Sequence, residues 1–336
     1  MRIALVIEHS ETIELLRQVL AFTPSCEVTW VSQSGADAVR MAARNRPDLI
    51  LIDPVLPIMS AVSTIGQIMR DSPCAILVVT PSVSTHSNRV FEALGAGALD
   101  AVCTPIREAD GQISGNRELL AKIHRIEKLI QPRESQPKNG NLRAPTACDC
   151  FSLLAIGSST GGPAALAEIL SGLPISQGLS VVIIQHVDQL FSSSLVEWLQ
   201  SRSTLPITLA EEGKPPKRDL VQLAATNDHL TLGSDKLFHY IREPADFPYR
   251  PSVDVFFSSL ADNWKRRGCA VLLTGMGRDG AEGLLTLRRS GWHTITQDQK
   301  TSVVFGMPKA AQELGAAIEV LPVSEIASAV TRWQTP

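Results

Sequence analysis

Apolar and polar positions repeat with two different periods along the first 130 residues of the chain. Short apolar runs, which have the length of buried strands, occur at residues 3–7, 28–31, 49–52, 76–79 and 101–103. Segments with apolar residues on one helical face lie between and after them, at residues 11–20, 36–44, 63–70, 87–94 and 117–130. This alternation predicts an α/β fold in which residues 1–130 form a doubly wound, flavodoxin-like domain around an open parallel sheet.

A polar segment at residues 131–147 separates this domain from a second one. It is rich in Pro, Asn, Gln, Lys and Arg and lacks apolar periodicity, which is typical of a flexible linker. The alternation then resumes, with strands expected at 153–156, 181–186, 270–273 and 294–296, and helices at 164–173, 192–201, 252–267, 281–290, 308–314 and 324–333. Short runs at 207–208, 220–224 and 230–232 predict a small β-rich insertion. We therefore expect a second doubly wound α/β domain at residues 148–336.

Three expected strands of the second domain end in side chains that are typical of acyl-transfer chemistry. Residues 157–161, Gly-Ser-Ser-Thr-Gly, match the G-x-S-x-G spacing with Ser159 at the centre, beside backbone N–H groups that can hold an oxyanion. His186 ends the expected strand at 181–186, and Asp279 follows the expected strand at 270–273. Since the carboxyl ends of parallel strands meet at one edge of a sheet, the three side chains can form a nucleophile, a base and an orienting carboxylate.

The spacing of these residues leaves alternatives open. It does not separate His186 from His229, or Asp279 from Asp254 and Asp298. The chain order Ser, His, Asp also differs from the Ser, Asp, His order of α/β-hydrolases. The glycine-rich turn is also compatible with a phosphate cradle at a helix start or with a plain tight turn.

Polar residues also follow the strands of the first domain. Glu8 and His9 come after the first strand, Asp53 after the third and Thr104 after the fifth. This layout resembles a response-regulator receiver domain, which implies that Asp53 is the phosphoacceptor and that Glu8 and Asp53 bind Mg²⁺. His9 stands where the family has a second acid, and Thr104 where it has a lysine. Imidazole is a poor ligand for Mg²⁺, and the lost lysine removes a positive charge from the phosphoryl oxygens.

Composition narrows the class of protein. Apolar residues make up 44% of the 336 residues, the net charge is −3, and aromatic residues make up 5%, with no long basic run. These values argue for a globular protein that binds no nucleic acid. No apolar stretch is long enough to enter a membrane and the N-terminus lacks the layout of a signal peptide, so we expect a cytoplasmic protein. The six cysteines are scattered, and the Cys148–Cys150 spacing has no second pair, so reduced thiols are expected and zinc is not.

Five stretches of the second domain occur in the order seen in the CheB family of chemotaxis protein-glutamate methylesterases. They are Ala-Ile-Gly-Ser-Ser-Thr-Gly-Gly (155–162), Gln-His (185–186), Tyr-Arg-Pro-Ser-Val-Asp (249–254), Leu-Thr-Gly-Met-Gly-Arg-Asp-Gly-Ala (273–281) and Phe-Gly-Met-Pro (305–308). With the receiver, the resemblance covers nearly the whole chain. Arg278 and the segments 98–102 and 185–188 resemble the WspF-like branch, which is associated with surface sensing.

The resemblance implies roles for individual residues. Ser159 would be the nucleophile, His186 the general base and Asp279 its orienting carboxylate, with Thr160 and the backbone of Met276 lining the oxyanion hole. The implied reaction hydrolyses glutamate γ-methyl esters, and in family members also deamidates glutamine, on a methyl-accepting chemoreceptor-like partner. The esterase site would need no cofactor. A CheA-type histidine kinase would supply the phosphoryl group, and the receiver would cover the esterase site until phosphorylated.

Two other functions compete with this hypothesis. A non-catalytic signalling adaptor would account for the altered receiver residues, and a nucleotide-binding protein would use the glycine-rich turn. The chain lacks both G-x-G-x-x-G and a Walker lysine, which disfavours the nucleotide hypothesis. For the receiver, slow phosphorylation of Asp53 and signalling by docking alone both remain open.

Overall fold

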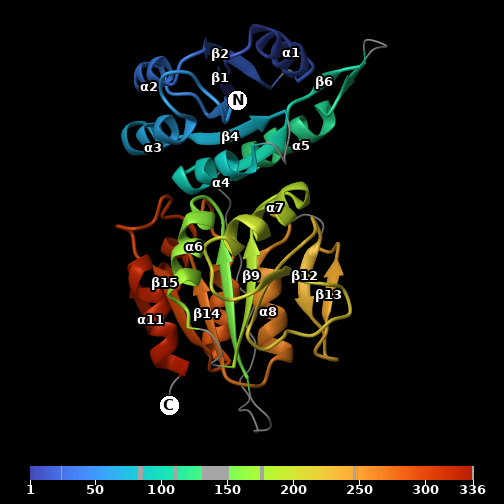
Figure 1. The fold of residues 1–336 in the computed structure, drawn as a ribbon, viewed down its shortest axis with the longest axis vertical. Coiled ribbons are helices and arrows are strands. Elements are labelled where there is room, and N and C mark those ends of the chain that lie inside the picture. Colours follow the sequence, from blue (N-terminus) through green and yellow to red (C-terminus); the bar gives the residue numbers. More distant parts are fainter. Residues whose placement is uncertain are drawn as a thin grey trace. The chain divides into compact units, whose positions relative to one another are not determined.

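The computed structural model describes residues 1–23, 25–81, 86–108, 112–130, 151–174, 178–244, 247 and 249–334 (Figure 1). The predicted linker at residues 131–147 and the two neighbouring cysteines, Cys148 and Cys150, lie outside the described residues. The chain divides into two compact units, residues 1–132 and 133–336.

The first unit is an α/β domain whose main sheet, within the described residues, is parallel and has the strand order β2-β1-β3-β4-β5. Its elements are β1 (Arg2–Val6), α1 (Ser10–Ala21), β2 (Glu27–Ser32), α2 (Gly35–Arg44), β3 (Leu49–Ile52), α3 (Ala61–Asp71), β4 (Ala75–Thr80), α4 (Ser87–Ala96), β5 (Asp100–Cys103), β6 (Ile106–Arg107), β7 (Ile113–Ser114) and α5 (Asn116–Ile130). Every predicted strand and helix is present, with ends within one or two residues. The antiparallel pair β6–β7 was not predicted, because two-residue strands carry no period.

The apolar runs become strands because both faces of the sheet are covered. All residues of β3 and β4 are buried, as expected for central strands of a parallel sheet with helices on both sides. The chain places β2 on one side of β1 and then β3, β4 and β5 on the other side, so the strand order reverses between β1 and β3. Glu8 and Asp53 follow the carboxyl ends of these two strands. Ligand sites of doubly wound sheets lie at such a reversal.

The second unit contains a parallel sheet with the strand order β10-β11-β9-β8-β14-β15-β16 among the described residues. Its elements are β8 (Ser152–Ser158), α6 (Gly162–Gly172), β9 (Leu179–Gln185), α7 (Gln189–Gln200), β10 (Ile207–Leu209), β11 (Leu220–Leu223), β12 (His229–Leu232), β13 (Phe238–Ile241), α8 (Val253–Asn263), β14 (Gly268–Leu272), α9 (Ala281–Arg289), β15 (His293–Gln297), α10 (Met307–Glu313), β16 (Glu319–Leu321) and α11 (Val323–Gln334). From β8 the chain builds outward through β9 on one side and, later, through β14 on the other. The reversal point therefore lies between β8 and β14.

The predicted β-rich segment divides between two sheets. Strands β10 and β11 extend the main parallel sheet next to β9, whereas β12 pairs with the unpredicted β13 as an antiparallel hairpin outside it. Helix α8 ends at Asn263, four residues before its predicted end. Trp264 takes an extended conformation there, and its indole N–H donates to the carbonyl of Arg267, which leads the chain into β14.

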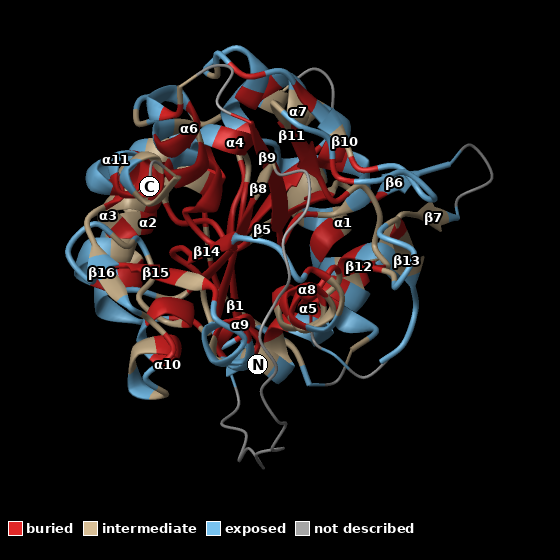
Figure 2. Cartoon of the chain, turned by 90° about the horizontal axis from the view of Figure 1, so that it is seen from below, coloured by how far each residue is buried: buried red, intermediate tan, exposed pale blue. Residues whose placement is uncertain are grey.

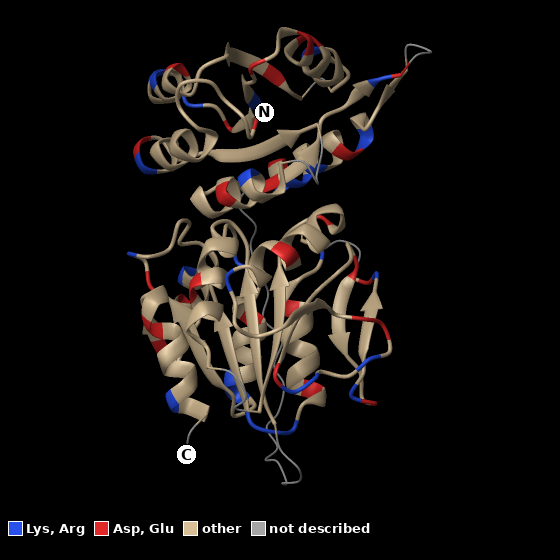
Figure 3. Cartoon of the chain, viewed as in Figure 1, with Lys and Arg blue, Asp and Glu red and all other residues tan. Residues whose placement is uncertain are grey.

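Burial and charge follow the layers of each unit. The strands of both main sheets are largely buried, and exposure increases toward the outer helix faces and loops (Figure 2). In each unit Lys and Arg are mixed with Asp and Glu, mainly on helices and loops, so neither sign dominates a face of the unit (Figure 3). No helix in the described parts of the chain has the length and apolar character that a membrane span requires.

Candidate active site

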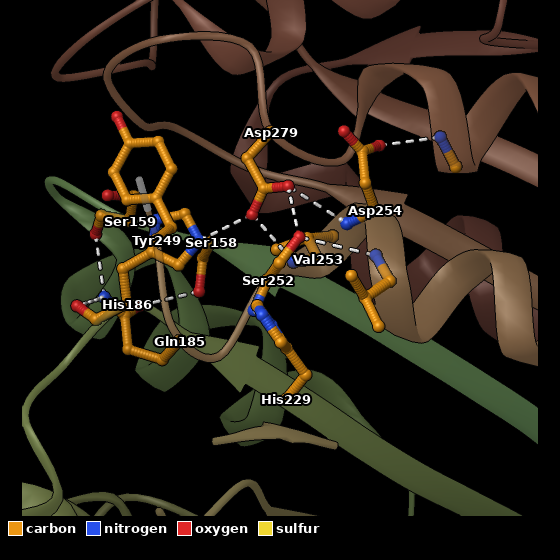
Figure 4. Close-up of polar contacts among 12 residues, drawn as sticks. Ser158, Ser159, Gln185, His186, His229, Tyr249, Ser252, Val253, Asp254 and Asp279 are labelled. Carbon is orange, nitrogen blue, oxygen red and sulfur yellow. Dashed lines mark hydrogen bonds and ion pairs between the residues drawn. The ribbon is translucent and has the colours of Figure 1, made fainter. Parts of the chain in front are cut away.

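Strand register brings the three predicted side chains of the second domain to one edge of the sheet (Figure 4). Ser159 directly follows β8 and His186 directly follows β9, two strands that pair side by side with Ser158 opposite Gln185. The backbone N–H of His186 donates to the carbonyl of Ser158 over 3.0 Å. Asp279 lies in the turn between β14 and α9, and β14 pairs with the other side of β8. All three residues therefore lie around the reversal point of the sheet.

The turn after β8 requires both glycines of the G-x-S-x-G spacing. A Cβ on Gly157 would lie 2.3 Å from a methyl group of Val253. Gly161 has a φ of +79°, and a Cβ there would lie 2.7 Å from the side chain of Val303. Ser159 itself does not have a positive φ, so the turn lacks the strained nucleophile conformation of α/β-hydrolases.

His186 and Asp279 form a direct, buried contact. The Nε2 of His186 lies 2.8 Å from the Oδ2 of Asp279, and the two residues are 9% and 6% exposed. An ionised carboxylate only accepts hydrogen bonds, so this contact assigns the proton to Nε2 and leaves the lone pair on Nδ1. The plane of the imidazole is fixed by the ring of Tyr249, which stacks on it with centroids 4.1 Å apart.

Asp279 is held by further donors at the start of α8. The hydroxyl of Ser252 donates to its Oδ1 over 2.7 Å, and the backbone N–H of Val253 donates to its Oδ2 over 2.7 Å. The backbone N–H of Asp254 also donates to Oδ1, over 3.1 Å. Burial opposes the charged form, but the hydrogen bonds from His186, Val253 and Ser252 outweigh it and hold the pKa of Asp279 below its usual range. The carboxylate is therefore ionised at neutral pH.

Three buried polar side-chain atoms in and around the His186–Asp279 pair make no hydrogen bond. They are the Oγ of Ser159, the Oγ1 of Thr160 and the Nδ1 of His186. Buried polar atoms are nearly always paired in folded proteins, so a group of unpaired ones indicates a place where another molecule is expected to bind. The structure thus joins His186 to Asp279, and leaves Ser159 and the free nitrogen of His186 without partners.

Two backbone N–H groups beside Ser159 are candidates for holding an oxyanion. The N–H groups of Thr160 and Met276 donate to no other residue in the described parts of the chain. The peptide that carries the Met276 N–H is fixed at its other end, because its carbonyl, that of Gly275, accepts from the backbone N–H groups of Gly306 and Met307 over 3.1 and 2.9 Å. Free, fixed N–H groups of this kind stabilise negative charge without having to reorganise.

Gln185 braces the two loops that carry Ser159 and His186. Its side-chain amide donates to the carbonyls of both residues, over 3.0 and 3.1 Å, and its oxygen accepts from the hydroxyl of Ser158 over 2.6 Å. The Gln185-His186 pair was part of the family resemblance, but nothing in the sequence indicated this bracing contact. Ser252 caps α8 at the start of the predicted helix, and its second role as a donor to Asp279 depends on a residue 27 positions away.

The alternative candidates from the sequence, His229, Asp254 and Asp298, form hydrogen bonds outside the Ser159–His186–Asp279 set. His229 contacts the backbone N–H of Ser252 and the carbonyl of Pro244, and it does not contact Asp279 directly. Asp254 accepts from the backbone N–H of Gly283, and burial together with the nearby Asp279 charge raises the pKa of its carboxyl well above the usual range. Asp298 accepts from Thr301.

The groups near Asp53 in the receiver are mixed in charge. One carboxyl oxygen of Asp53 accepts from the backbone N–H of Val55 over 3.1 Å. Burial raises the pKa of Asp53, opposed by the Val55 hydrogen bond and by the positive influence of His9 and His86, while Glu8 adds to the increase.

The groups near Asp53 do not form a ligand set that fits Mg²⁺. Mg²⁺ requires hard oxygen ligands in an octahedron, and an imidazole, that of His9, lies beside Glu8 in place of a second carboxylate. No group of three or more His, Cys, Asp or Glu side chains in the described residues is placed to hold a metal ion.

Comparisons with known proteins identify the families of both domains. A sequence model of the family described as CheB methylesterase matches residues 154–330, and one described as response regulator receiver domain matches residues 3–112. A protein of Cupriavidus metallidurans named protein-glutamate methylesterase/protein-glutamine glutaminase 2 is 46% identical over 328 residues, which cover 97% of this chain and 96% of that protein. A Pseudomonas fluorescens protein named protein-glutamate methylesterase/protein-glutamine glutaminase 1 is 47% identical over 327 residues, with 97% of each chain covered.

A solved structure supports the fold of the second unit. The crystal structure of the Thermotoga maritima CheB methylesterase catalytic domain is 35% identical, with a TM-score of 0.52, and covers 55% of this chain and 99% of that chain. The family match spans more than half of the chain, and the relatives cover nearly all of it. The chain therefore belongs to the CheB methylesterase family, with a response regulator receiver domain ahead of its catalytic domain.

Proposed function

We propose that this protein hydrolyses glutamate γ-methyl esters, with Ser159 as nucleophile, His186 as general base and Asp279 as the carboxylate that orients it. The observation that carries the proposal is the 2.8 Å contact between His186 Nε2 and Asp279, beside the unpartnered Ser159 Oγ and His186 Nδ1. A serine hydroxyl is a weak nucleophile at neutral pH unless a base removes its proton. In this arrangement the base is Nδ1, because Asp279 keeps the proton on Nε2.

The reaction follows from these positions. Ser159 Oγ attacks the ester carbonyl while His186 Nδ1 takes its proton, and the imidazolium that forms is stabilised by Asp279. The N–H groups of Thr160 and Met276 receive the developing oxyanion. His186 returns the proton to the leaving methoxide, which departs as methanol, and a water activated by the same nitrogen then hydrolyses the γ-glutamyl ester on Ser159. A glutamine side chain would react in the same way and release ammonia.

The substrate in this proposal is a glutamate side chain on a methyl-accepting chemoreceptor-like protein. The names of the relatives, which join glutamate methylesterase to glutamine glutaminase, support a protein side chain as the substrate. The receiver is the regulatory domain, with a CheA-type histidine kinase as phosphodonor. The pathway is chemosensory, serving either receptor adaptation or surface sensing.

An adaptor without catalytic activity is less well supported. An adaptor needs neither a buried His186–Asp279 pair held by further hydrogen bonds nor unpartnered Ser159 and Thr160 hydroxyls beside it. Buried polar groups without partners cost stability, and this cost is explained if the groups act on a substrate.

Methanol release from a methylated chemoreceptor cytoplasmic fragment tests the proposal. We expect release by the wild type and none by Ser159→Ala. The matched control is Ser180→Ala, because Ser180 is also a fully buried serine without a hydrogen-bond partner, but lies in β9 away from its carboxyl end. Equal release by Ser159→Ala and the wild type would refute the role of Ser159. An inactive wild type that still binds several receptors would favour the adaptor.

A further inference from the structure

His229 is the first residue of the hairpin strand β12 and contacts Ser252 at the start of α8. It is fully buried, and it was an open alternative to His186 on spacing alone. Its Nδ1 lies 3.1 Å from the backbone nitrogen of Ser252, and its Nε2 lies 3.2 Å from the carbonyl oxygen of Pro244. Figure 4 shows it below Ser252, with Asp279 above Ser252.

The partners of His229 define its protonation state. A backbone N–H can only donate, so Nδ1 must be the acceptor and the proton must reside on Nε2, which donates to Pro244. Burial, with a smaller contribution from the positive charge of Arg250, lowers the pKa of His229, against the opposing influence of Asp279, Asp228 and the Pro244 hydrogen bond. The neutral imidazole is therefore the form that fits this position.

The residue that His229 holds begins a segment of three consecutive donors. Ser252 through its hydroxyl, and Val253 and Asp254 through their backbone N–H groups, all donate to Asp279. The direction of these three groups depends on where the chain enters α8, and the Ser252 N–H is the first backbone group of that entry. A polar chain thus runs from His229 through Ser252 and Asp279 to His186.

The hairpin reinforces this arrangement along the helix. The backbone N–H of Leu232 donates to the hydroxyl of Ser259 over 2.9 Å, and the side-chain amide of Asn263 donates to the Leu232 carbonyl over 2.8 Å. Together with the His229–Ser252 contact, these bonds attach β12 to both ends of α8. These contacts indicate that the hairpin holds α8 in position in the catalytic domain.

We propose that neutral His229 is a positioning residue for the esterase reaction: it fixes Ser252, and through it the orientation of Asp279 and His186. This inference rests on the proposed function, since positioning matters only if His186 acts as a base. It adds a histidine that touches neither substrate nor the reacting atoms.

Two variants of the full-length protein separate positioning from simple filling of the core. His229→Asn retains an acceptor at the position of Nδ1, whereas His229→Gln retains polarity at the position of Nε2 but lacks that acceptor. Both remove the ring. We expect His229→Gln to lower kcat for methanol release by about tenfold with KM unchanged, since a transition-state interaction is weakened. We expect His229→Asn to stay close to the wild type. Equal losses in both variants, or no loss in His229→Gln, would overturn the proposal.

Nuclear magnetic resonance gives a readout that needs neither a substrate nor a variant. In the ¹⁵N-labelled wild type, we expect His229 to show a protonated Nε2 and an unprotonated Nδ1 from pH 6.5 to 8. A protonated Nδ1 would overturn the proposal even if neither variant folds.

The same method applied to the variants reports on the His186–Asp279 contact. In His229→Gln, the downfield proton between His186 and Asp279 should weaken or shift, while His229→Asn should retain it. If the wild type releases no methanol but shows the expected tautomer and shift, the proposed reaction fails while the positioning contact stands.

Discussion

Replacing Asp279 with asparagine should abolish most of the activity without unfolding the protein. Four donors converge on this carboxylate, from His186 Nε2, the Ser252 hydroxyl and the backbone of Val253 and Asp254. An amide offers one oxygen with two acceptor positions, so its NH₂ group must face two of these donors. If that NH₂ faces His186, the imidazole proton moves to Nδ1, and the lone pair that should receive the Ser159 proton is lost.

The magnitude follows from the loss of the correct tautomer. In a serine protease with a Ser-His-Asp triad, the corresponding substitution lowers kcat by about 10⁴-fold, which corresponds to about 5.5 kcal/mol of transition-state stabilisation. Two donors left without an acceptor cost stability of about 1–3 kcal/mol each. We therefore expect Asp279→Asn to lower kcat by about 10⁴-fold. We also expect the free energy of unfolding of the catalytic domain to fall by about 2–6 kcal/mol.

The assay is methanol release at saturating receptor fragment, with urea unfolding of the same samples. Asp254→Asn is the matched control, because Asp254 is also largely buried but only its backbone contacts Asp279, and that N–H remains. The pKa of Asp254 is raised, so an amide resembles the protonated acid that burial already favours. A folded Asp279→Asn protein with kcat near the wild type, or an equal loss in Asp254→Asn, would refute the reasoning.

Three further predictions concern the turn, the receiver and pH. An alanine in the left-handed region costs about 1–2 kcal/mol of folding free energy. Gly161→Ala should lower the free energy of unfolding in urea by more than this, because its Cβ would also meet Val303. Gly213→Ala, with φ +70° and no atom within 4 Å of the added Cβ, should show this cost alone. Acetyl phosphate with Mg²⁺ should modify Asp53 slowly and incompletely, and faster in Thr104→Lys, by intact mass; rapid, stoichiometric modification of the wild type would contradict this. Folding lowers the pKa of His229, so neutral His229 contributes its full stability above the unfolded pKa of about 6.5. This contribution is lost as the pH falls from about 6.5 toward the folded pKa, so His229→Asn should show a smaller loss of unfolding free energy over this pH range than the wild type. Parallel curves of unfolding free energy against pH would contradict the prediction.

The sequence by itself determined the secondary structure and the two sheets to a large extent. Runs such as 49–52 and 153–156 are continuous, short and apolar because both faces of a parallel strand are buried, and that requirement leaves a local signal. Strand pairing is less local. The sequence predicted strands at 207–208 and 220–224, but only the contact of β11 with β9 places them in the main sheet. The end of α8 likewise depends on the packing of Trp264, which periodicity does not encode.

The candidate site shows the same division. The residue types at strand ends were readable, because parallel strands bring their carboxyl ends to one edge whatever their separation along the chain. The choice of partner was not readable from spacing alone: His186 and His229 both lie near strand ends, and only the tertiary structure joins His186 to Asp279 and His229 to Ser252. The physical reason is that a hydrogen bond depends on distances of about 3 Å and on direction, which strand order and register set and which linear spacing does not carry.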